Sequence, residues 1–377
     1  MKKITYLLGI LCLLYSCTVS QKKEDGMAVI NFGHNEKVKA AELFSLSFLK
    51  LETNENALLG AVSQIKEADG KLVLLDVFLS HKAYIFDRQG KFISQLGNIG
   101  NGPGEYVIPS SCIIDQKKGI VSIIDPSQQK VIDYSLYDYK FLSEKKVPFS
   151  SNFAERLTDD EWAWHNASYE GEAPYYGIYL TDNDFEIKKE MLDLDFASGY
   201  KQGMVRKVYK HGETVSTYSH YSPILYGVNA DVAYERFRFD FGKYQYPSLD
   251  FFLKEGANHK NYVEALQNSS YVNFYEVHES SRFLCVPYFV DKTMYYGFYD
   301  KQNDKIYNYN QNEMQEDLQI GLYSSPVGIT SDGYFISLLN PGKLKELKEN
   351  GVILNKELDA LIETSTEDDN PILLFYK

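Results

Sequence analysis

The sequence has few of the residues and patterns that indicate a helical, metal-binding or nucleic-acid-binding protein. Its 377 residues include only 4 cysteines, 2 tryptophans and 11 prolines, and long helical periodicity is mostly absent. No H-E-x-x-H or C-x-x-C spacing occurs, so a zinc site is not supported. The net charge of -13 and the lack of a long basic block argue against a nucleic-acid partner. No G-x-S-x-G elbow occurs either, and we assign no catalytic residue, no metal site and no cofactor.

Aromatic residues are plentiful, in contrast, and they favour β-structure. The chain has 31 tyrosines and 22 phenylalanines, which pack well on the pleated surface of a sheet. Beyond the N-terminal leader and its cleavage region, the cysteines are Cys112 and Cys285, each inside an apolar stretch. We expect buried free thiols at these positions, although an oxidising compartment leaves a disulfide open.

The N-terminus has the layout of a secretory signal peptide. Lys2 and Lys3 precede an apolar run, residues 4–14, which is too short to span a bilayer as a helix. The following Leu14-Tyr15-Ser16-Cys17 resembles a bacterial lipobox, in which the cysteine is acylated and becomes the new N-terminus. We therefore expect residues 1–17 to be a lipoprotein signal ending at a lipidated Cys17, with a membrane partner through that lipid. A plain signal peptide cut elsewhere is the alternative.

The segment that follows the lipobox is polar at its start. Residues 18–26 have too few apolar side chains to pack, so we expect a flexible tether over residues 18–40 and a folded domain over residues 41–377. Lys23-Glu24-Asp25 resembles the signal that sends some Bacteroidetes lipoproteins to the cell surface. A tether that faces the periplasm is the alternative.

An internal repeat predicts the fold. Gly70–Asp76 aligns with Gly119–Asp125 at an offset of 49 residues (70 to 119), and Lys91-Phe92 recurs at the same offset as Lys140-Phe141. Each unit reads as three or four short strands separated by turns. This period is typical of a propeller blade, because radial packing of blades covers both faces of each sheet. The chain beyond the leader, divided by this period, contains six to seven units, and six fits better.

Later segments supply the strands of four further blades, less regularly. The runs that we assign to them are 161–165 with 175–180, 222–228 with 233–242, 282–288 with 295–300, and 332–339 with 371–376. We expect Ser45–Glu52 to close the ring by pairing with the last blade. Two insertions, 249–267 and 343–362, look helical and should sit over a face or edge of the ring, and Asn350-Gly351 should break the second into two short helices.

A glycine-rich stretch at the junction of the first two units carries a family resemblance. Phe86–Phe92 has the pattern F-D-x-x-G-K-F, and Gly97–Tyr106 has the pattern G-x-x-G-x-G-P-G-E-Y. With residues 224–226 and 234–243, these runs resemble the six-bladed β-propeller lipoproteins of Bacteroidetes and, more loosely, NHL-repeat propellers. The resemblance implies an all-β, six-bladed propeller with short helical insertions in the cell envelope, and it implies little about chemistry.

The glycine-rich stretch could alternatively cradle a phosphate, but it fails that test. No Lys-Ser or Lys-Thr pair follows it, and it does not open a βαβ unit. In the structural interpretation, Gly102 and Gly104 allow a backbone path that a Cβ would forbid, and Pro103 stiffens it. The family-motif residues interpreted as structural are Gly97, Gly100, Gly102, Pro103, Gly104, Glu105 and Tyr106, with Glu105 accepting backbone N–H bonds.

Two sets of side chains are candidates for ligand contact. Asp76 and Asp125 occupy equivalent blade positions and could bind a cation in a central channel, although a turn-closing role is favoured. A second set could stack against a sugar ring, although packing between blades is favoured because aromatics bury the most area there. This second set consists of Trp162, Trp164, Tyr175 and Tyr176.

The sequence leaves two functions open. The first is a lipid-anchored propeller of the cell envelope, at the outer membrane, that binds a glycan, peptide or protein, and the absence of a catalytic constellation motivates it. The alternative is an envelope lyase or hydrolase that acts on glycan at the mouth of the central channel. Histidines, arginines, tyrosines and acids gathered around a metal-sized gap at that mouth would favour the enzyme.

Overall fold

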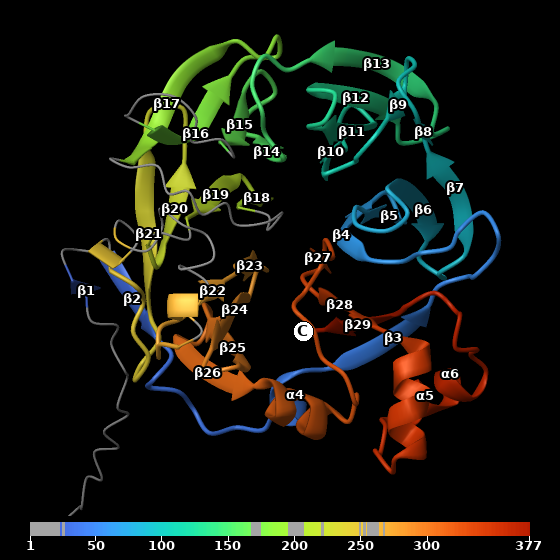
Figure 1. Ribbon diagram of the computed structural model, residues 1–377, viewed down its shortest axis with the longest axis vertical. Coiled ribbons are helices and arrows are strands. Elements are labelled where there is room, and N and C mark those ends of the chain that lie inside the picture. The colour runs from blue at the N-terminus through green and yellow to red at the C-terminus, as the bar shows by residue number, and fades with distance from the viewer. Residues whose placement is uncertain are drawn as a thin grey trace, which may run out of the picture.

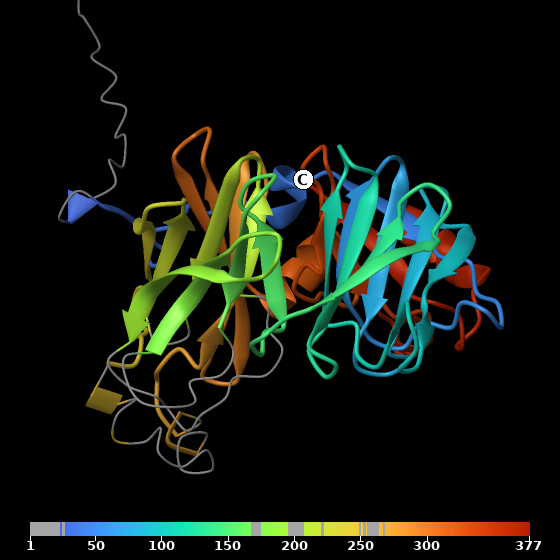
Figure 2. The same cartoon turned by 90° about the horizontal axis from the view of Figure 1, so that it is seen from above.

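Six blades of β-strands are arranged radially around a central channel in the computed structural model (Figure 1). The structure describes residues 23–24, 27–166, 175–194, 207–219, 222–248, 250–251, 254, 264–266 and 268–377. Seen from above, the sheets stand side by side with their strands roughly parallel to the channel (Figure 2). The fold is the predicted six-bladed β-propeller.

Within each blade the strands run outward from the channel to the rim. Blade 1 contains β4 (Val62–Ala68), β5 (Lys71–Asp76), β6 (Lys82–Asp87) and β7 (Phe92–Leu96); blade 2 contains β10 (Ser111–Asp115), β11 (Ile120–Asp125), β12 (Lys130–Ser135) and β13 (Phe141–Lys146); blade 3 contains β14 (Phe153–Arg156), β15 (Trp162–His165), β16 (Tyr175–Thr181) and β17 (Ile187–Leu194); blade 4 contains β18 (Val208–His211), β19 (Thr214–Tyr218), β20 (Ile224–Val228) and β21 (Ala233–Asp240); blade 5 contains β22 (Phe274–Tyr275) and β23 (His278–Glu279), which both pair with β24 (Phe283–Val290), then β25 (Thr293–Asp300) and β26 (Lys305–Asn310); blade 6 contains β27 (Gly328–Ile329), β28 (Phe335–Leu339), β29 (Ile372–Tyr376) and β3 (Leu46–Lys50).

The two faces of the ring carry different loops because neighbouring strands within a blade are antiparallel. One face carries the connections between blades and the hairpins between second and third strands, such as residues 97–110 and 126–129. We call it the connection face. The opposite face, which we call the hairpin face, carries the remaining hairpins, such as residues 69–70 and 88–91.

Burial along a blade explains the sequence pattern of its strands. The second strand of blade 1, β5, is packed on both sides by neighbouring blades, and all of its residues after Lys71 are buried. At the rim of blade 2, β13 lies beyond this packing and every one of its residues is exposed. The second strands therefore read as continuous apolar runs, whereas rim strands are polar.

The ring closes as expected from the sequence. Strand β3 pairs antiparallel with β29, with Leu374 opposite Phe48, so the N-terminal strand is the rim strand of the last blade (Figure 1). On the inner side, β27 pairs in parallel with β4 and joins blade 6 to blade 1. The two chain ends thus hold the ring shut through main-chain hydrogen bonds.

The expected tether over residues 18–40 is wrong for its second half. Strand β2 (Met27–Asn31) pairs in parallel with β21 at the rim of blade 4, and β1 (Lys23–Glu24) pairs with β2. The cause is an apolar run in which Ile30 and Phe32 are fully buried. From there the chain crosses blade 5, where the Glu36 N–H donates to the Ile306 carbonyl, and enters β3. The N-terminal segment therefore straps blades 4, 5 and 6.

Four short helices have both of their bounds within the described residues. As expected, the insertion after β28 forms two helices, α5 (Pro341–Glu349) and α6 (Lys356–Glu363), at the edge of the ring (Figure 1). The sequence reading missed α1 (Ala40–Leu43) and α4 (Gln311–Leu318), which is capped by Asn310. The other expected insertion, residues 249–267, lies largely outside the described residues. No helix within the described ranges is long and apolar enough to cross a membrane.

The glycine-rich stretch is the connection between blades 1 and 2. It forms a small parallel pair, β8 (Asn98–Ile99) with β9 (Glu105–Tyr106). As expected, the Glu105 carboxylate accepts the Gly102 N–H, at 2.8 Å. The Tyr106 hydroxyl, fully buried, donates to the Leu96 carbonyl at 2.7 Å and accepts the Ala83 N–H at 3.0 Å. These bonds hold the connection against the end of blade 1.

Gly104→Ala should destabilise the protein by about 2 to 4 kcal/mol, because it adds strain from a positive φ to overpacking. Gly104 has φ +69°, and a Cβ there would lie 2.7 Å from the Phe141 ring. Gly70→Ala is the matched control, since Gly70 also has φ +69° but no atom within 4 Å of its Cβ position. Urea unfolding of both variants measures the difference, and equal losses would refute a packing role for Gly104.

Candidate functional site

Polar side chains from blades 3, 4 and 5 converge near the channel on the connection face. Lys207 directly precedes β18, His165 ends β15, and Glu276 lies in the interruption between β22 and β23, two residues before His278. The Lys207 carbonyl accepts the Tyr218 N–H at 3.2 Å and the Thr217 hydroxyl at 2.9 Å, which fixes this backbone at the edge of blade 4. We call His165, Lys207, Glu276 and His278 the central cluster.

Lys207 is the least satisfied member of the central cluster. The residue is only 4% exposed, yet among the described groups its Nζ atom has no hydrogen-bond partner and no carboxylate forms an ion pair with it. The ammonium lies over two aromatic rings, 4.6 Å from the centroid of Tyr218 and 5.9 Å from that of Tyr275. Burial lowers the pKa of Lys207 to about 7, although the charge of Glu276 opposes the shift.

His165 adds a second unpartnered polar atom to the central cluster. Its Nδ1 atom is buried without a hydrogen-bond partner among the described groups. Burial, and then the nearby charge of Lys207, lower the pKa of His165 to about 3, so the ring is neutral at physiological pH. A neutral imidazole offers one donor and one acceptor nitrogen.

Glu276 and His278 form a pair within the central cluster. The Glu276 carboxylate and the His278 Nε2 atom lie 3.2 Å apart, and their side chains are 23% and 14% exposed. Burial alone would raise the pKa of Glu276, but the hydrogen bond and charge of His278, with the charge of Lys207, outweigh it and lower the pKa below its usual value. The Glu276 carboxylate is therefore charged and already engaged.

A second polar network near blades 4 and 5 is fully satisfied and differs from the central cluster in that respect. Glu279, the last residue of β23, accepts two bonds from the Arg236 guanidinium at 2.8 and 2.9 Å. The Lys301 ammonium at 2.9 Å and the Tyr209 hydroxyl at 3.0 Å complete its shell. With every charge compensated, this network has the character of a structural brace.

The two aspartates considered as cation ligands close turns instead. Asp76 and Asp125 are fully buried at the ends of β5 and β11. Each holds the connection that leads into its own blade, since Asp76 accepts the Gly60 N–H and Asp125 accepts the Val107 N–H, both at 2.6 Å. In the described part of the chain, no group of three or more His, Cys, Asp or Glu side chains is arranged to hold a metal ion.

The aromatic residues considered for sugar stacking are placed mainly in the core. Trp162 and Trp164 are 2% and 0% exposed and stack on each other, with ring centroids 5.7 Å apart. Their indole N–H groups donate to Asn183 and Thr181. The ligand-stacking interpretation is therefore wrong for both tryptophans, because alternate residues of β15 point into the gap between blades. Tyr176 is half-buried, and the side chain of Tyr175 lies outside the described residues, as does Cys17.

Cys112 and Cys285 are both buried and neither forms a disulfide, as expected. They belong to different hydrophobic clusters, Cys112 between blades 1 and 2 and Cys285 between blades 5 and 6.

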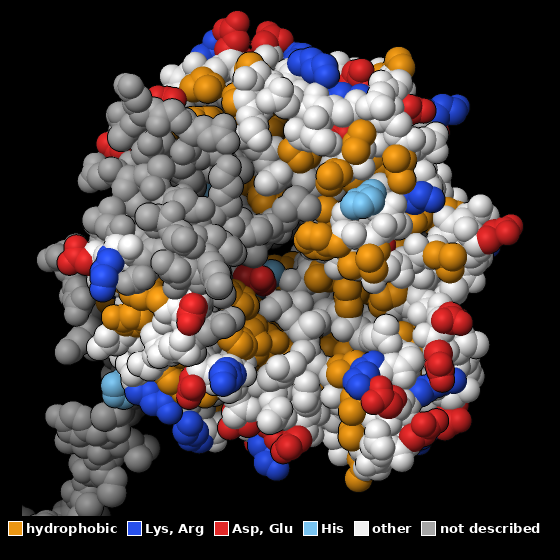
Figure 3. All heavy atoms as spheres, viewed as in Figure 1, with side chains coloured by type: hydrophobic (Ala, Val, Ile, Leu, Met, Phe, Trp, Pro, Cys, Tyr) orange, Lys and Arg blue, Asp and Glu red, His pale blue; other side chains and the backbone are white. Residues whose placement is uncertain are grey.

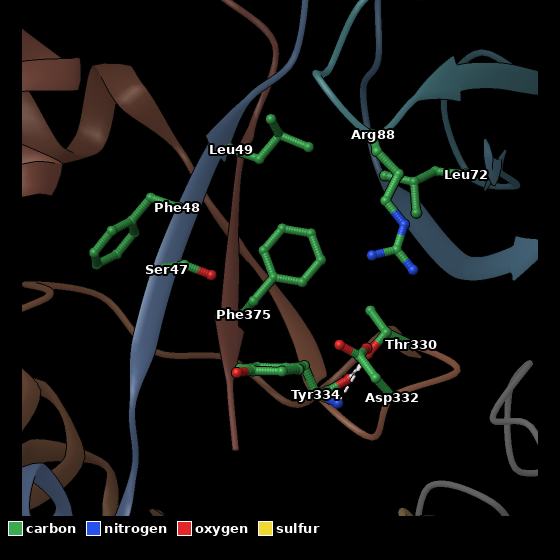
Figure 4. A pocket seen from close by; sticks show the side chains of 9 residues that line it. All are labelled: Ser47, Phe48, Leu49, Leu72, Arg88, Thr330, Asp332, Tyr334 and Phe375. Atoms are coloured by element: carbon green, nitrogen blue, oxygen red, sulfur yellow. Dashed lines mark hydrogen bonds between the residues drawn. The ribbon is translucent and has the colours of Figure 1, made fainter. Parts of the chain in front are cut away.

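Several hollows are open to solvent in the described surface, and one of about 650 Å³ lies beside the glycine-rich connection. A hollow lies at the centre of the ring, with acidic and histidine atoms beside it (Figure 3). A separate cavity of about 230 Å³ lies on the hairpin face between blades 6 and 1, where Arg88 reaches toward the Phe375 ring (Figure 4). There the Arg88 guanidinium pairs with Glu67, whose other oxygen accepts from Ser331. In the described lining of this cavity between blades 6 and 1, no buried polar side-chain atom lacks a partner.

The sequence reading did not find the central cluster. His165 and His278 stood among seven scattered histidines, and neither Lys207 nor Glu276 belongs to a motif. The only available signal was position, because both lie at the start of the innermost strand of a blade. This position can be recognised only when the boundaries of the blades are known. The sequence repeat that marks such boundaries is least regular in blades 3 to 5.

Comparison with known proteins confirms the six-bladed fold and finds a similar protein that is described as exported. A family model, DUF5128, described as a 6-bladed beta-propeller, matches residues 19–337. A crystal structure of a Bacteroides fragilis protein described as exported is similar at 34% identity and a TM-score of 0.88, covering 93% of this chain and 99% of that one. A Bacteroides vulgatus protein of the DUF4221 family shares 9% identity with a TM-score of 0.51, covering 89% and 98%, which shows the fold alone. A search of curated proteins finds no match.

Proposed function

The chain belongs to the DUF5128 family of six-bladed β-propellers, and from that premise we propose that it is a lipid-anchored envelope protein that binds a ligand at the central cluster. The ligand is a glycan, a peptide or an exposed segment of a protein. The similarity to an exported Bacteroides protein supports a location outside the cytoplasm.

The observation that carries this proposal is the unpartnered Lys207 amine. A buried polar group without a partner destabilises a fold by about 1 to 3 kcal/mol, and a charged one by more. The same region of the ring satisfies Glu279 with four hydrogen bonds, so the fold is able to compensate buried charge. A group left unsatisfied at the centre of a ring is typical of a binding site that awaits its partner.

An envelope glycan lyase or hydrolase is the second candidate. A lysine with a pKa of about 7 beside a His–Glu pair has the groups needed for proton transfer at neutral pH. Among the described groups, the Ser325 hydroxyl hydrogen-bonds to Glu276. Binding is favoured because the partner that Lys207 lacks is an acceptor, which a bound ligand supplies without any reaction. Release of reducing ends from a ligand, lost in Lys207→Met, would favour the enzyme.

The anchor follows from the lipobox and is tested separately. Replacing Cys17 by alanine removes the thiol that would be acylated, so incorporation of labelled palmitate should fall to background and the protein should leave the membrane fraction. Cys112→Ala is the matched control, because that thiol is buried and should leave labelling unchanged. Persistent labelling of the Cys17→Ala variant would contradict the lipid anchor.

A ligand screen tests the binding function. The full-length protein, purified in detergent, is melted in the presence of glycan and peptide libraries, because a ligand that binds only the native state raises the melting temperature. We expect stabilising compounds whose effect disappears in Lys207→Met and persists in Lys210→Met. Lys210 is a partly exposed lysine within β18, the strand that Lys207 precedes. Hits that act equally on both variants would place binding elsewhere.

A further inference from the structure

We infer that the central cluster binds its ligand through a carboxylate group that pairs with Lys207 and contacts His165. This inference rests on the proposed function and names the chemical class of the ligand. It follows from which hydrogen-bonding capacities the cluster leaves unused.

The group missing at Lys207 is an acceptor. An ammonium carries three donors and no acceptor, and none of the three has a partner among the described groups. The neighbouring rings offer only their faces, because the Tyr275 hydroxyl already donates to the carbonyls of Ser222 and Ser219, at 2.7 and 3.0 Å. An incoming ligand must therefore bring oxygen lone pairs to this position.

A negative charge suits the position better than a neutral acceptor. Among the described acids, Glu276 is the one whose charge acts on Lys207, and its carboxylate is engaged by His278 at 3.2 Å. His165, on the neighbouring blade, is neutral and has an unpartnered Nδ1 that can donate to a second oxygen. Two donors from two blades fit the two oxygens of a carboxylate.

A single negative charge suits the position beside the Lys207 amine better than the double charge of a phosphate monoester does. The bound group would lie near the charged Glu276, in a chain with a net charge of -13. A second negative charge would be repelled without a second cation to compensate it. An acidic sugar and the side chain or C-terminus of a peptide both carry the required group.

Binding should be coupled to protonation of Lys207. The groups that face this amine are Glu276, His165 and the rings of Tyr218 and Tyr275, with His278 behind Glu276. A carboxylate favours the ammonium form, whose fraction falls about tenfold between pH 6 and pH 8 when the pKa is about 7. Affinity for a carboxylate should therefore fall about tenfold over this range.

Acetate and acetamide are the probes, since they share a shape and differ in charge. The Cε resonances of carbon-13-labelled lysine are followed in the full-length protein, with Lys207 assigned from its absence in Lys207→Arg. We expect acetate to shift the Lys207 signal, with about tenfold weaker binding at pH 8 than at pH 6, and acetamide to leave it unchanged. Lys207→Met should abolish acetate binding, and Lys210→Met should retain it.

Two outcomes would overturn the inference. One is that acetamide binds as well as acetate, and the other is that acetate leaves the Lys207 signal unchanged at every pH. Lys207→Arg keeps the charge and should bind acetate equally at pH 6 and 8, so a persisting pH dependence would contradict the assignment of the proton to Lys207. If the screen finds only uncharged compounds whose binding depends on Lys207, the proposed binding function would stand. The inference that the ligand carries a carboxylate would be wrong.

Discussion

Replacing Lys207 by methionine is expected to stabilise the protein, by about 2 to 5 kcal/mol at pH 6. An unfolded lysine titrates near 10.5, whereas burial lowers the pKa of Lys207 to about 7 in the folded state. Each unit of this difference corresponds to about 1.4 kcal/mol. Methionine has a similar length and adapts to irregular space, so the substitution removes the charge without leaving a large void.

The pH dependence of this gain has a defined sign. Between pH 7 and 10.5 the unfolded state binds more protons than the folded state, so the stability of the wild type rises with pH across that window. The destabilisation by Lys207 is complete below pH 7 and fades toward pH 10.5. The gain in Lys207→Met should shrink accordingly when urea unfolding is measured at pH 6, 8 and 9.5.

Lys210→Met is the matched control for this measurement. Its side chain is 27% exposed and lies 4.0 Å from Glu213, so its removal should change stability by about 0.5 kcal/mol or less. A clear loss of stability in Lys207→Met would show that the amine has a stabilising partner in the folded protein. The reason for regarding the central cluster as a binding site would then be gone.

Glu279→Gln should have the opposite effect and destabilise the protein by about 3 to 5 kcal/mol. The Glu279 side chain is 1% exposed and compensates Arg236 and Lys301 at the same time. Loss of its charge leaves both cations uncompensated inside the ring, and breaking a buried ion pair from one side typically has this magnitude. Urea unfolding at pH 7 measures the loss.

Acid unfolding gives an independent measure of the same carboxylate. Burial would raise the pKa of Glu279, but Arg236 and then Lys301 outweigh it and lower the pKa to about 2. A depressed folded-state pKa contributes stability above pH 4.5, and this is lost as pH falls toward 2. Glu279→Gln should lack that part of the acid transition.

Glu276→Gln provides the contrast, because Glu276 is 23% exposed and forms one pair with His278. The free energy of unfolding of the Glu276→Gln variant should be lower than that of the wild type by about 1 kcal/mol. If Glu279→Gln proved equally mild, the distinction between a structural brace and an unsatisfied central cluster would not hold.

Much of the ring could be predicted from local sequence signals. The 49-residue repeat and the turn glycines identified the first two blades, and the alternation of Ser45–Glu52 indicated the closing strand. The break at Asn350-Gly351 separated α5 from α6 because these residues are poor in a helix interior. Each of these features depends on residues close together in the chain.

The N-terminal strap and the role of the tryptophans were harder to predict. Met27–Phe32 reads as a strand only if a rim with a free edge is available, and blade 4 supplies that edge some 200 residues later. Trp162 and Trp164 share one face of a strand, which suits a binding platform and a core equally. Only the packing of blade 2 against blade 3 decides between them.

The central cluster could not be predicted from sequence for a geometric reason. His165 and Glu276 are separated by a whole blade, and only the radial arrangement brings them to one channel. No spacing rule links such residues, since the distance depends on the lengths of the intervening loops. Both residues lie near the channel and toward the connection face of their blades. This shared position can be recognised only in the folded ring.

The central claim, that the middle of the connection face is a ligand site, is tested most directly by a crystal structure with the strongest stabilising compound from the screen. The account predicts ligand density within hydrogen-bond distance of the Lys207 Nζ atom, with a carboxylate oxygen as the nearest group. Density confined to the cavity beside Arg88 and Phe375 on the hairpin face (Figure 4), with Lys207 still unpartnered, would contradict it.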